Sequence, residues 1–185
     1  MNKKIENCIA KMIRYYEAGS YKNALDISDK VAEEFNINSI IDASTPIILG
    51  SDTYILIKQL ADFHAIRGAC YRKLHTLNKA LSEYQKAARG AVQAHLTILE
   101  IQEEQKHYKK VISLAKELKK KFANYYDVDF LHGVQLILCR ALLLLGEEKL
   151  AQHELDILLQ EVPRDSKKKD YITNNLAQLR TDLAK

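Results

Sequence analysis

The feature that most constrains this chain is a pattern that occurs four times along it. Each copy has a short turn, followed by a small or apolar residue near the start of a second predicted helix. The copies begin at Tyr15, Gly68, Glu103 and Leu142. Only two prolines and six glycines interrupt the 185 residues, which favours long helices. An internal repeat of this kind predicts helix pairs that bury their apolar faces by stacking on one another.

The second copy shows the pattern most fully, and its signature residues are Gly68, Tyr71, Ala80, Tyr84 and Ala87. Where two helices cross, a side chain larger than alanine holds their axes apart. Gly68 and Ala80 therefore predict a close crossing, and Tyr71 and Tyr84 are expected to fill the space between neighbouring helices. The alternative is a plain helical bundle in which this spacing is a coincidence.

The pattern resembles the tetratricopeptide repeat (TPR), a unit of about 34 residues in two antiparallel helices, here named helix A and helix B. The first copy matches the family at Tyr15, Gly19 and Ala24, and the fourth matches it at Gly146, Ala151 and Pro163. The chain departs from the family pattern at Met12, at His75 in place of the turn glycine, at Tyr108 in the third turn and at Val111 in place of alanine.

The resemblance implies an all-α fold, a TPR-like right-handed superhelix of antiparallel helix pairs, in a single domain over residues 1–185. We expect repeats at residues 5–36, 61–91, 92–124 and 132–165, with an insertion at 37–50 that contains Pro46 and Gly50. Tyr171, Leu176, Leu179 and Leu183 follow at helical intervals. They predict a capping helix over 166–184 that covers the last repeat.

In TPR arrays the A helices line a concave groove. The groove residues that the resemblance implies are Ile9, Ile13, Tyr16, Arg72, Lys73, Leu96, Glu100, Leu136, Arg140, Leu143 and Leu144. Some family members clamp a carboxylate with Lys and Asn on helix A, but Ile9, Ile13, Ala65 and Ala69 occupy the matching positions, so we expect no clamp of that kind. The mixture of apolar and charged residues favours a peptide or helix with an apolar anchor. Alternatively, the insertion and the C-terminal helix cover these residues, or they form a homodimer.

The sequence predicts no catalytic, cofactor or metal site. None of the six histidines belongs to an HExxH motif, no Cys/His cluster has zinc spacing, and we expect each histidine at the surface or partly packed. Cys8, Cys70 and Cys139 fall in predicted A helices, where small residues pack, and we expect them to be structural.

These observations predict a non-enzymatic adaptor that binds another protein, within a multi-subunit complex or alone. The alternative is a nucleic-acid-binding helical repeat that uses Lys119–Lys121 and Lys167–Lys169, although a net charge of +4 is mild for that function. The most apolar stretch, residues 136–145, is about half of a membrane span and contains Arg140. An odd number of cysteines without a signal peptide favours the cytoplasm, with the nucleus as an open alternative.

Overall fold

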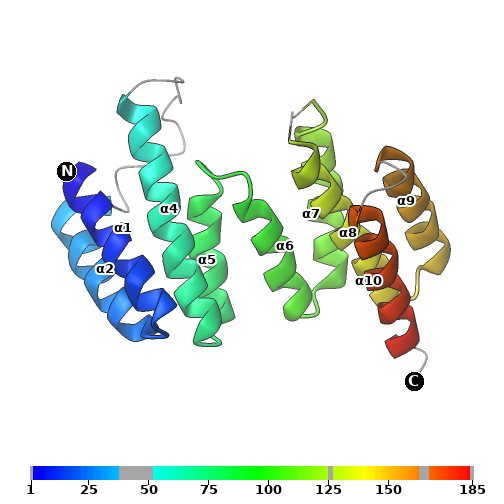
Figure 1. Cartoon of the computed structure of the whole chain (residues 1–185), viewed down its shortest axis with the longest axis horizontal. Helices are drawn as coiled ribbons and strands as arrows, with labels where there is room; N and C mark the ends of the chain where they lie inside the picture. Colours follow the sequence, from blue (N-terminus) through cyan, green and yellow to red (C-terminus); the bar gives the residue numbers. More distant parts are fainter. Residues whose placement is uncertain (1, 38–51, 125–126, 163–166, 184–185) are drawn as a thin grey trace. The chain divides into compact units, whose positions relative to one another are not determined.

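The protein is all-helical in every part that its computed structural model describes, namely residues 2–37, 52–124, 127–162 and 167–183 (Figure 1). The predicted all-α class is confirmed. Pro163 and nearly all of the predicted insertion lie outside the described residues. The described helices are α1 (Asn2–Glu17), α2 (Tyr21–Phe35), α4 (Asp52–Lys73), α5 (Leu77–Ala87), α6 (Ala94–Glu104), α7 (Tyr108–Lys121), α8 (Val128–Leu144), α9 (Glu148–Glu161) and α10 (Lys167–Leu183).

The helices form two compact units, Met1–Ile98 (unit 1) and Leu99–Lys185 (unit 2). The boundary between them falls inside α6, which has 11 residues and is the shortest of the four A helices. The repeat pattern did not predict a division at this point. A single domain over 1–185 and its superhelical form stay predictions.

Four turns with the same geometry join the helices pairwise, α1 to α2, α4 to α5, α6 to α7 and α8 to α9. The central residue of each turn has a positive φ: 71° at Gly19, 56° at His75, 61° at Lys106 and 77° at Gly146. In each turn the amide of the next residue donates to the carbonyl five residues earlier, over 2.8 Å in the first turn and 2.9 Å in the others. This is the Schellman motif that ends a helix. The short turns return the chain as antiparallel pairs.

The four pairs also share one buried position. The fifth residue after each turn residue is Ala24, Ala80, Val111 or Ala151, and all four are buried. Each of their amides donates to the carbonyl of the residue that directly follows the turn residue. These four residues therefore occupy the same position in the backbone geometry of their pairs, and the described chain repeats one helix–turn–helix unit.

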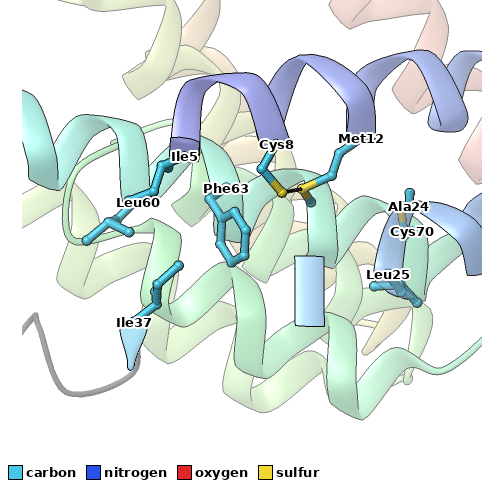
Figure 2. Packing of buried hydrophobic residues seen from close by; sticks show 9 residues of the cluster. All are labelled: Ile5, Cys8, Met12, Ala24, Leu25, Ile37, Leu60, Phe63 and Cys70. Atoms are coloured by element: carbon cyan, nitrogen blue, oxygen red, sulfur yellow. Dashed lines mark hydrogen bonds between the residues drawn. The ribbon is translucent and has the colours of Figure 1, made fainter. Parts of the chain in front are cut away.

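Unit 1 is built from α1, α2, α4 and α5, with α4 packed against each of the other three. Figure 2 shows its core, to which α1 contributes Ile5, Cys8 and Met12, while Phe63 comes from α4. The dashed line joins the Cys8 and Met12 sulfur atoms, 3.7 Å apart. Ile37, the last described residue before the gap, is also buried in this cluster.

Gly68 performs the role that its position predicts. A Cβ atom built on Gly68 would lie 2.8 Å from two ring carbons of Tyr84, closer than real Cβ contacts. Tyr84 itself is buried on α5. The absence of a side chain at Gly68 thus allows α4 to pack directly on the ring that α5 presents.

Unit 2 is organised around α8, which packs against α7, α9 and α10. Because three helices surround it, most of its side chains are buried. Asp127 caps its N-terminus, accepting a hydrogen bond from the Phe130 amide at 3.0 Å. On α10, Ile172 and Leu176 are buried, so α10 packs on the fourth A helix as the predicted capping helix should.

Candidate functional site

The predicted groove residues of unit 1 lie on three helices. Ile9, Ile13 and Tyr16 occupy one stripe of α1; Ile13 is 40% exposed, whereas Ile9 and Tyr16 are half-buried and pack against the unit 1 core. At the end of α4, Lys73 is exposed and Arg72 is half-buried. Leu96 is half-buried on α6. Of the predicted apolar anchors in this unit, Ile13 is the most accessible.

In unit 2 the predicted groove residues differ in accessibility. Leu136 and Leu143 are only 9% and 4% exposed, so they are core residues of unit 2 rather than open anchors. The physical reason is that α8 is packed on several sides, including by α10. This matches the alternative in which the C-terminal helix covers the fourth repeat. Leu144 and Glu100 are half-buried.

Arg140 joins the two A helices of unit 2. Its guanidinium donates to Glu103 Oε2 at 2.9 Å, which links α8 to α6. The second carboxylate oxygen, Glu103 Oε1, is buried without a hydrogen-bond partner among the described residues. Burial raises the pKa of Glu103, and the negative charges of Glu100 and Glu104 act in the same direction, against the attraction of Arg140. The predicted groove position Arg140 thus belongs to an ion pair between neighbouring repeats.

One buried polar cluster among the described residues was not predicted from the sequence. It lies in unit 1, where His64 and Arg67 on α4 meet Glu83 on α5. His64 Nδ1 lies 2.7 Å from Glu83 Oε2, and Arg67 Nε donates to the same oxygen at 3.1 Å. A carboxylate only accepts, so His64 Nδ1 carries the proton of that hydrogen bond.

Arg67 extends this cluster to α2. One of its terminal nitrogens donates to Asp29 Oδ1 at 2.6 Å and also to the Ser28 hydroxyl. The guanidinium carbon lies 5.7 Å from the centre of the Phe63 ring and 5.9 Å from that of Tyr71, which adds cation–π attraction. Arg67 therefore connects three helices of unit 1 through one side chain.

The electrostatics of the cluster favour its charged form. Burial acts to raise the pKa of Glu83, but the His64 hydrogen bond and the charge of Arg67 outweigh it, so the pKa of this carboxyl is lowered. Burial acts to lower the pKa of Arg67, and its two carboxylate neighbours, Glu83 and Asp29, reverse that effect and raise it. Burial would disfavour either charge alone, and each charge is stabilised by its oppositely charged partner.

The burial of two histidines corrects one expectation. Histidines were expected at the surface or partly packed, but His64 and His132 are each only 4% exposed. Helical periodicity identifies a buried face without revealing that a carboxylate from the next helix will meet a histidine on it. His64 is bound to Glu83 and enclosed, so the pair ties α4 to α5 and does not face solvent as a general base must.

A contact between helix A and helix B recurs at the same register in the first, second and fourth helix pairs. The partners are His64 with Glu83, Gln135 with Glu154 at 2.6 Å, and Cys8 with the Ile27 carbonyl at 3.8 Å. Each pair is 19 residues apart, and its first member lies 11 residues before the turn residue. The geometry repeats while the side-chain chemistry changes, which is why sequence inspection missed the position.

The cysteines have the properties of packing residues. All three are free thiols and all are buried. Burial raises the pKa of Cys70 to about 11 and that of Cys139 to about 12, and it also raises the pKa of Cys8. Thiols with such pKa values carry little of the thiolate that a nucleophile or metal ligand needs.

The first of the two predicted nucleic-acid surfaces is partly used within the protein. Lys119 donates to Glu154 on α9 at 2.9 Å, and the Lys121 ammonium lies 5.3 Å from the centre of the Phe122 ring.

Within the described part of the chain, no group of three or more His, Cys, Asp or Glu residues could hold a metal ion. None of the described helices is both long and apolar enough to cross a membrane. The cytoplasmic location stays a prediction.

Comparison with known proteins identifies no family. No protein-family model matches the sequence, and no curated protein matches it. Among solved structures, the chain resembles a chain in the structure of Naa15/Naa10 bound to HypK-THB, with 18% sequence identity and a TM-score of 0.43. The match covers 97% of this chain and 30% of that one. Because the TM-score is below 0.5, this likeness supports no conclusion.

Proposed function

We propose that this chain is a non-enzymatic adaptor of the tetratricopeptide-repeat type, which holds a segment of another protein against its A helices. The recurrence of one turn geometry and one buried small position in four helix pairs supports the repeat assignment. Helical repeats of this kind bury their cores through stacking and leave one face of each A helix for ligands. A pre-ordered scaffold also loses little entropy when a partner binds.

The α1 stripe is the best-supported contact surface on unit 1. Ile13 is exposed in the middle of it, and Ile9 and Tyr16 beside it are held in place by the unit 1 core. An apolar side chain fixed on a rigid helix suits a peptide or helix with an apolar anchor. Lys73 on α4 is an exposed cation that an acidic residue of the partner would neutralise.

The chemical character of the polar groups supports a binding role rather than catalysis. His64 is enclosed with Glu83, and the buried thiols are held protonated. The buried polar groups His64, Arg67 and Glu83 connect helices to one another. Their arrangement stiffens the scaffold, which is what an adaptor requires.

The test compares two exposed apolar residues on different kinds of helix. Ile13→Asp places a charge on the A-helix stripe, whereas Leu150→Asp places the same charge on α9, a B helix, at a side chain that is 51% exposed. Partners are captured from native cell extract with wild-type protein and both variants, and each is quantified by mass spectrometry. Circular dichroism checks that all three proteins stay helical.

We expect Ile13→Asp to weaken capture of the specific partner by about tenfold or more, because one buried isoleucine contributes about 1.5–3 kcal/mol. Leu150→Asp should capture it as wild type does. Retention of the partner by folded Ile13→Asp protein at the wild-type level would exclude the α1 stripe. Leu143→Asp is unsuitable here, because Leu143 is buried and a charge there tests folding instead of binding.

A further inference from the structure

Apart from the α1 stripe of unit 1, the structure has a candidate ligand pocket in unit 2. The turn between α6 and α7 lies beside the end of α8, and together they line a shallow pocket of about 550 Å³ that is widely open to solvent. Its size is in the range of small-ligand sites. The lining residues are Lys106, His107, Tyr108, Lys109, Lys110 and Leu145. None of them belongs to the predicted groove, so the pocket is independent of the proposed function.

The pocket concentrates positive charge that the described protein leaves uncompensated. Lys106, Lys109 and Lys110 are all exposed, and none forms an ion pair with any residue in the described ranges. No acidic residue stands in the first turn of α7. By contrast, Lys119 on the same helix is paired with Glu154. The three lysines of the pocket therefore have no ion-pair partner among the described residues.

The backbone around these lysines does not favour them either. Lys109 and Lys110 lie in the first turn of α7, where the helix dipole is positive and favours anions over cations. Lys106 occupies a left-handed conformation at φ 61°, which a lysine adopts at a cost and glycine would adopt freely. Helix stability thus explains none of the three lysines, whereas a bound anion would offset the positive charge of all three.

The remaining lining residues indicate what carries the anion. The Tyr108 side chain is half-buried, and the Leu145 side chain is a large exposed apolar group. His107 is held by Gln102, whose Oε1 lies 3.2 Å from its Nδ1. An anion attached to an apolar or aromatic group would pair with the lysines and also pack against Tyr108 and Leu145.

We propose that this pocket binds a phosphate monoester carried by a protein segment, with the phosphate at the three lysines and its apolar carrier against Tyr108 and Leu145. A phosphate monoester carries close to two negative charges and three acceptor oxygens, which suits several ammonium donors. A nucleic-acid strand fits less well, because it requires a basic track along several nucleotides and a row of stacking aromatics. This pocket is lined by one tyrosine, one histidine and three lysines, without a row of stacking rings.

The test uses the full chain and five probes. These are a phosphotyrosine pentapeptide, a phosphoserine pentapeptide, the unphosphorylated tyrosine pentapeptide, inorganic phosphate and a single-stranded RNA pentamer. Binding is followed by amide chemical shifts in ¹H–¹⁵N spectra at several salt concentrations. The pocket variant is Lys106→Asn, Lys109→Gln and Lys110→Gln combined. The matched control removes three exposed lysines elsewhere in unit 2, through Lys116→Gln, Lys120→Gln and Lys149→Gln.

We expect a phosphopeptide to bind with shifts centred on residues 106–110 and 145, and with affinity that falls as salt rises. The pocket variant should bind it at least tenfold more weakly, and the control variant should bind it as wild type does. Equal weakening in the two variants would overturn the proposal, as would equal binding of the phosphorylated and unphosphorylated peptides. Inorganic phosphate binding as tightly as both phosphopeptides would remove the role of a carrier segment. Tighter binding of the RNA, with the same shifts, would reassign the pocket to nucleic acid.

Discussion

At the scale of single residues, unit 1 depends on the missing side chain of Gly68 and on the contacts of the Glu83 carboxylate. Gly68 has no side chain, so the Tyr84 ring occupies the space that a Cβ would need. Glu83 is buried because His64 and Arg67 both contact the same oxygen. The first property was predicted from the sequence and the second was not, and each leads to a measurable consequence.

Gly68→Ala should destabilise the protein although alanine is the better helix former. The helix propensity of alanine favours the change by about 1 kcal/mol. Overpacking against a buried ring costs about 1–3 kcal/mol, so we expect a net loss of up to about 2 kcal/mol in urea unfolding. In a double-mutant cycle with Tyr84→Leu, part of that loss should be recovered. A Gly68→Ala protein at least as stable as wild type would show that the crossing has room for a methyl group.

Glu83→Gln should remove about 3–5 kcal/mol of stability near neutral pH, because it leaves Arg67 buried without its main counter-charge. The folded-state pKa of Glu83 lies below its ordinary value of 4.5, so its contribution is fully present above pH 4.5 and is lost as pH falls through the lower folded value. The difference in unfolding free energy between wild type and variant should therefore narrow as pH falls below 4.5 in unfolding curves recorded from pH 7 to 3.

The control for Glu83→Gln is Asp26→Asn, which removes an exposed carboxylate from α2 of the same unit. We expect this variant to stay within about 0.5 kcal/mol of wild type at every pH. A constant gap between Glu83→Gln and wild type across the whole range would contradict the assigned ionisation.

At the scale of elements, the turn determines how each helix pair closes. Two of the four turns use glycine at the positive-φ position, and the other two hold His75 and Lys106 in the same conformation. The hydrogen bonds are alike in all four, so the motif forms with or without glycine. The difference in residue type should appear as a difference in stability.

His75→Gly and Gly19→Ala should change stability in opposite directions. Relief of the left-handed conformation in His75→Gly should add about 0.5–1 kcal/mol. In Gly19→Ala the added Cβ would have no atom within 4 Å, so the expected loss of about 1 kcal/mol comes from the backbone alone. Both turns lie in unit 1, and thermal unfolding of the two variants measures both effects. Changes of the same sign would contradict the role given to φ.

At the scale of the whole molecule, the chain divides into two compact units. Unit 1 has the cluster around Phe63, and unit 2 is built around α8. In helical repeats each helix pair is stabilised by its immediate neighbours, so a destabilising substitution lowers stability locally. The effect of a core substitution should therefore be confined to the unit that contains it.

Leu176→Ala tests this confinement. Leu176 on α10 is 1% exposed, and its truncation should cost unit 2 about 2–5 kcal/mol. Native-state hydrogen exchange should become faster in α7, α8 and α9 and stay unchanged in α1, α2, α4 and α5. Leu183→Ala on the same helix, at a 51% exposed side chain, should leave exchange unchanged in both units. Equal acceleration in both units after Leu176→Ala would show a single cooperative core.

The sequence by itself determined the helical class, the equivalent residues of the four pairs and the close contact at Gly68. These features follow from local spacing, because a small residue and a turn at fixed intervals dictate which side chains meet within one pair. Only the tertiary structure decided that His64, Arg67 and Glu83 share a buried site, that Leu136 and Leu143 are enclosed, and that the third turn and Leu145 form a pocket. Those outcomes depend on which helices pack side by side. A repeat pattern specifies each helix pair, but it does not specify which side chains of neighbouring helices will contact that pair.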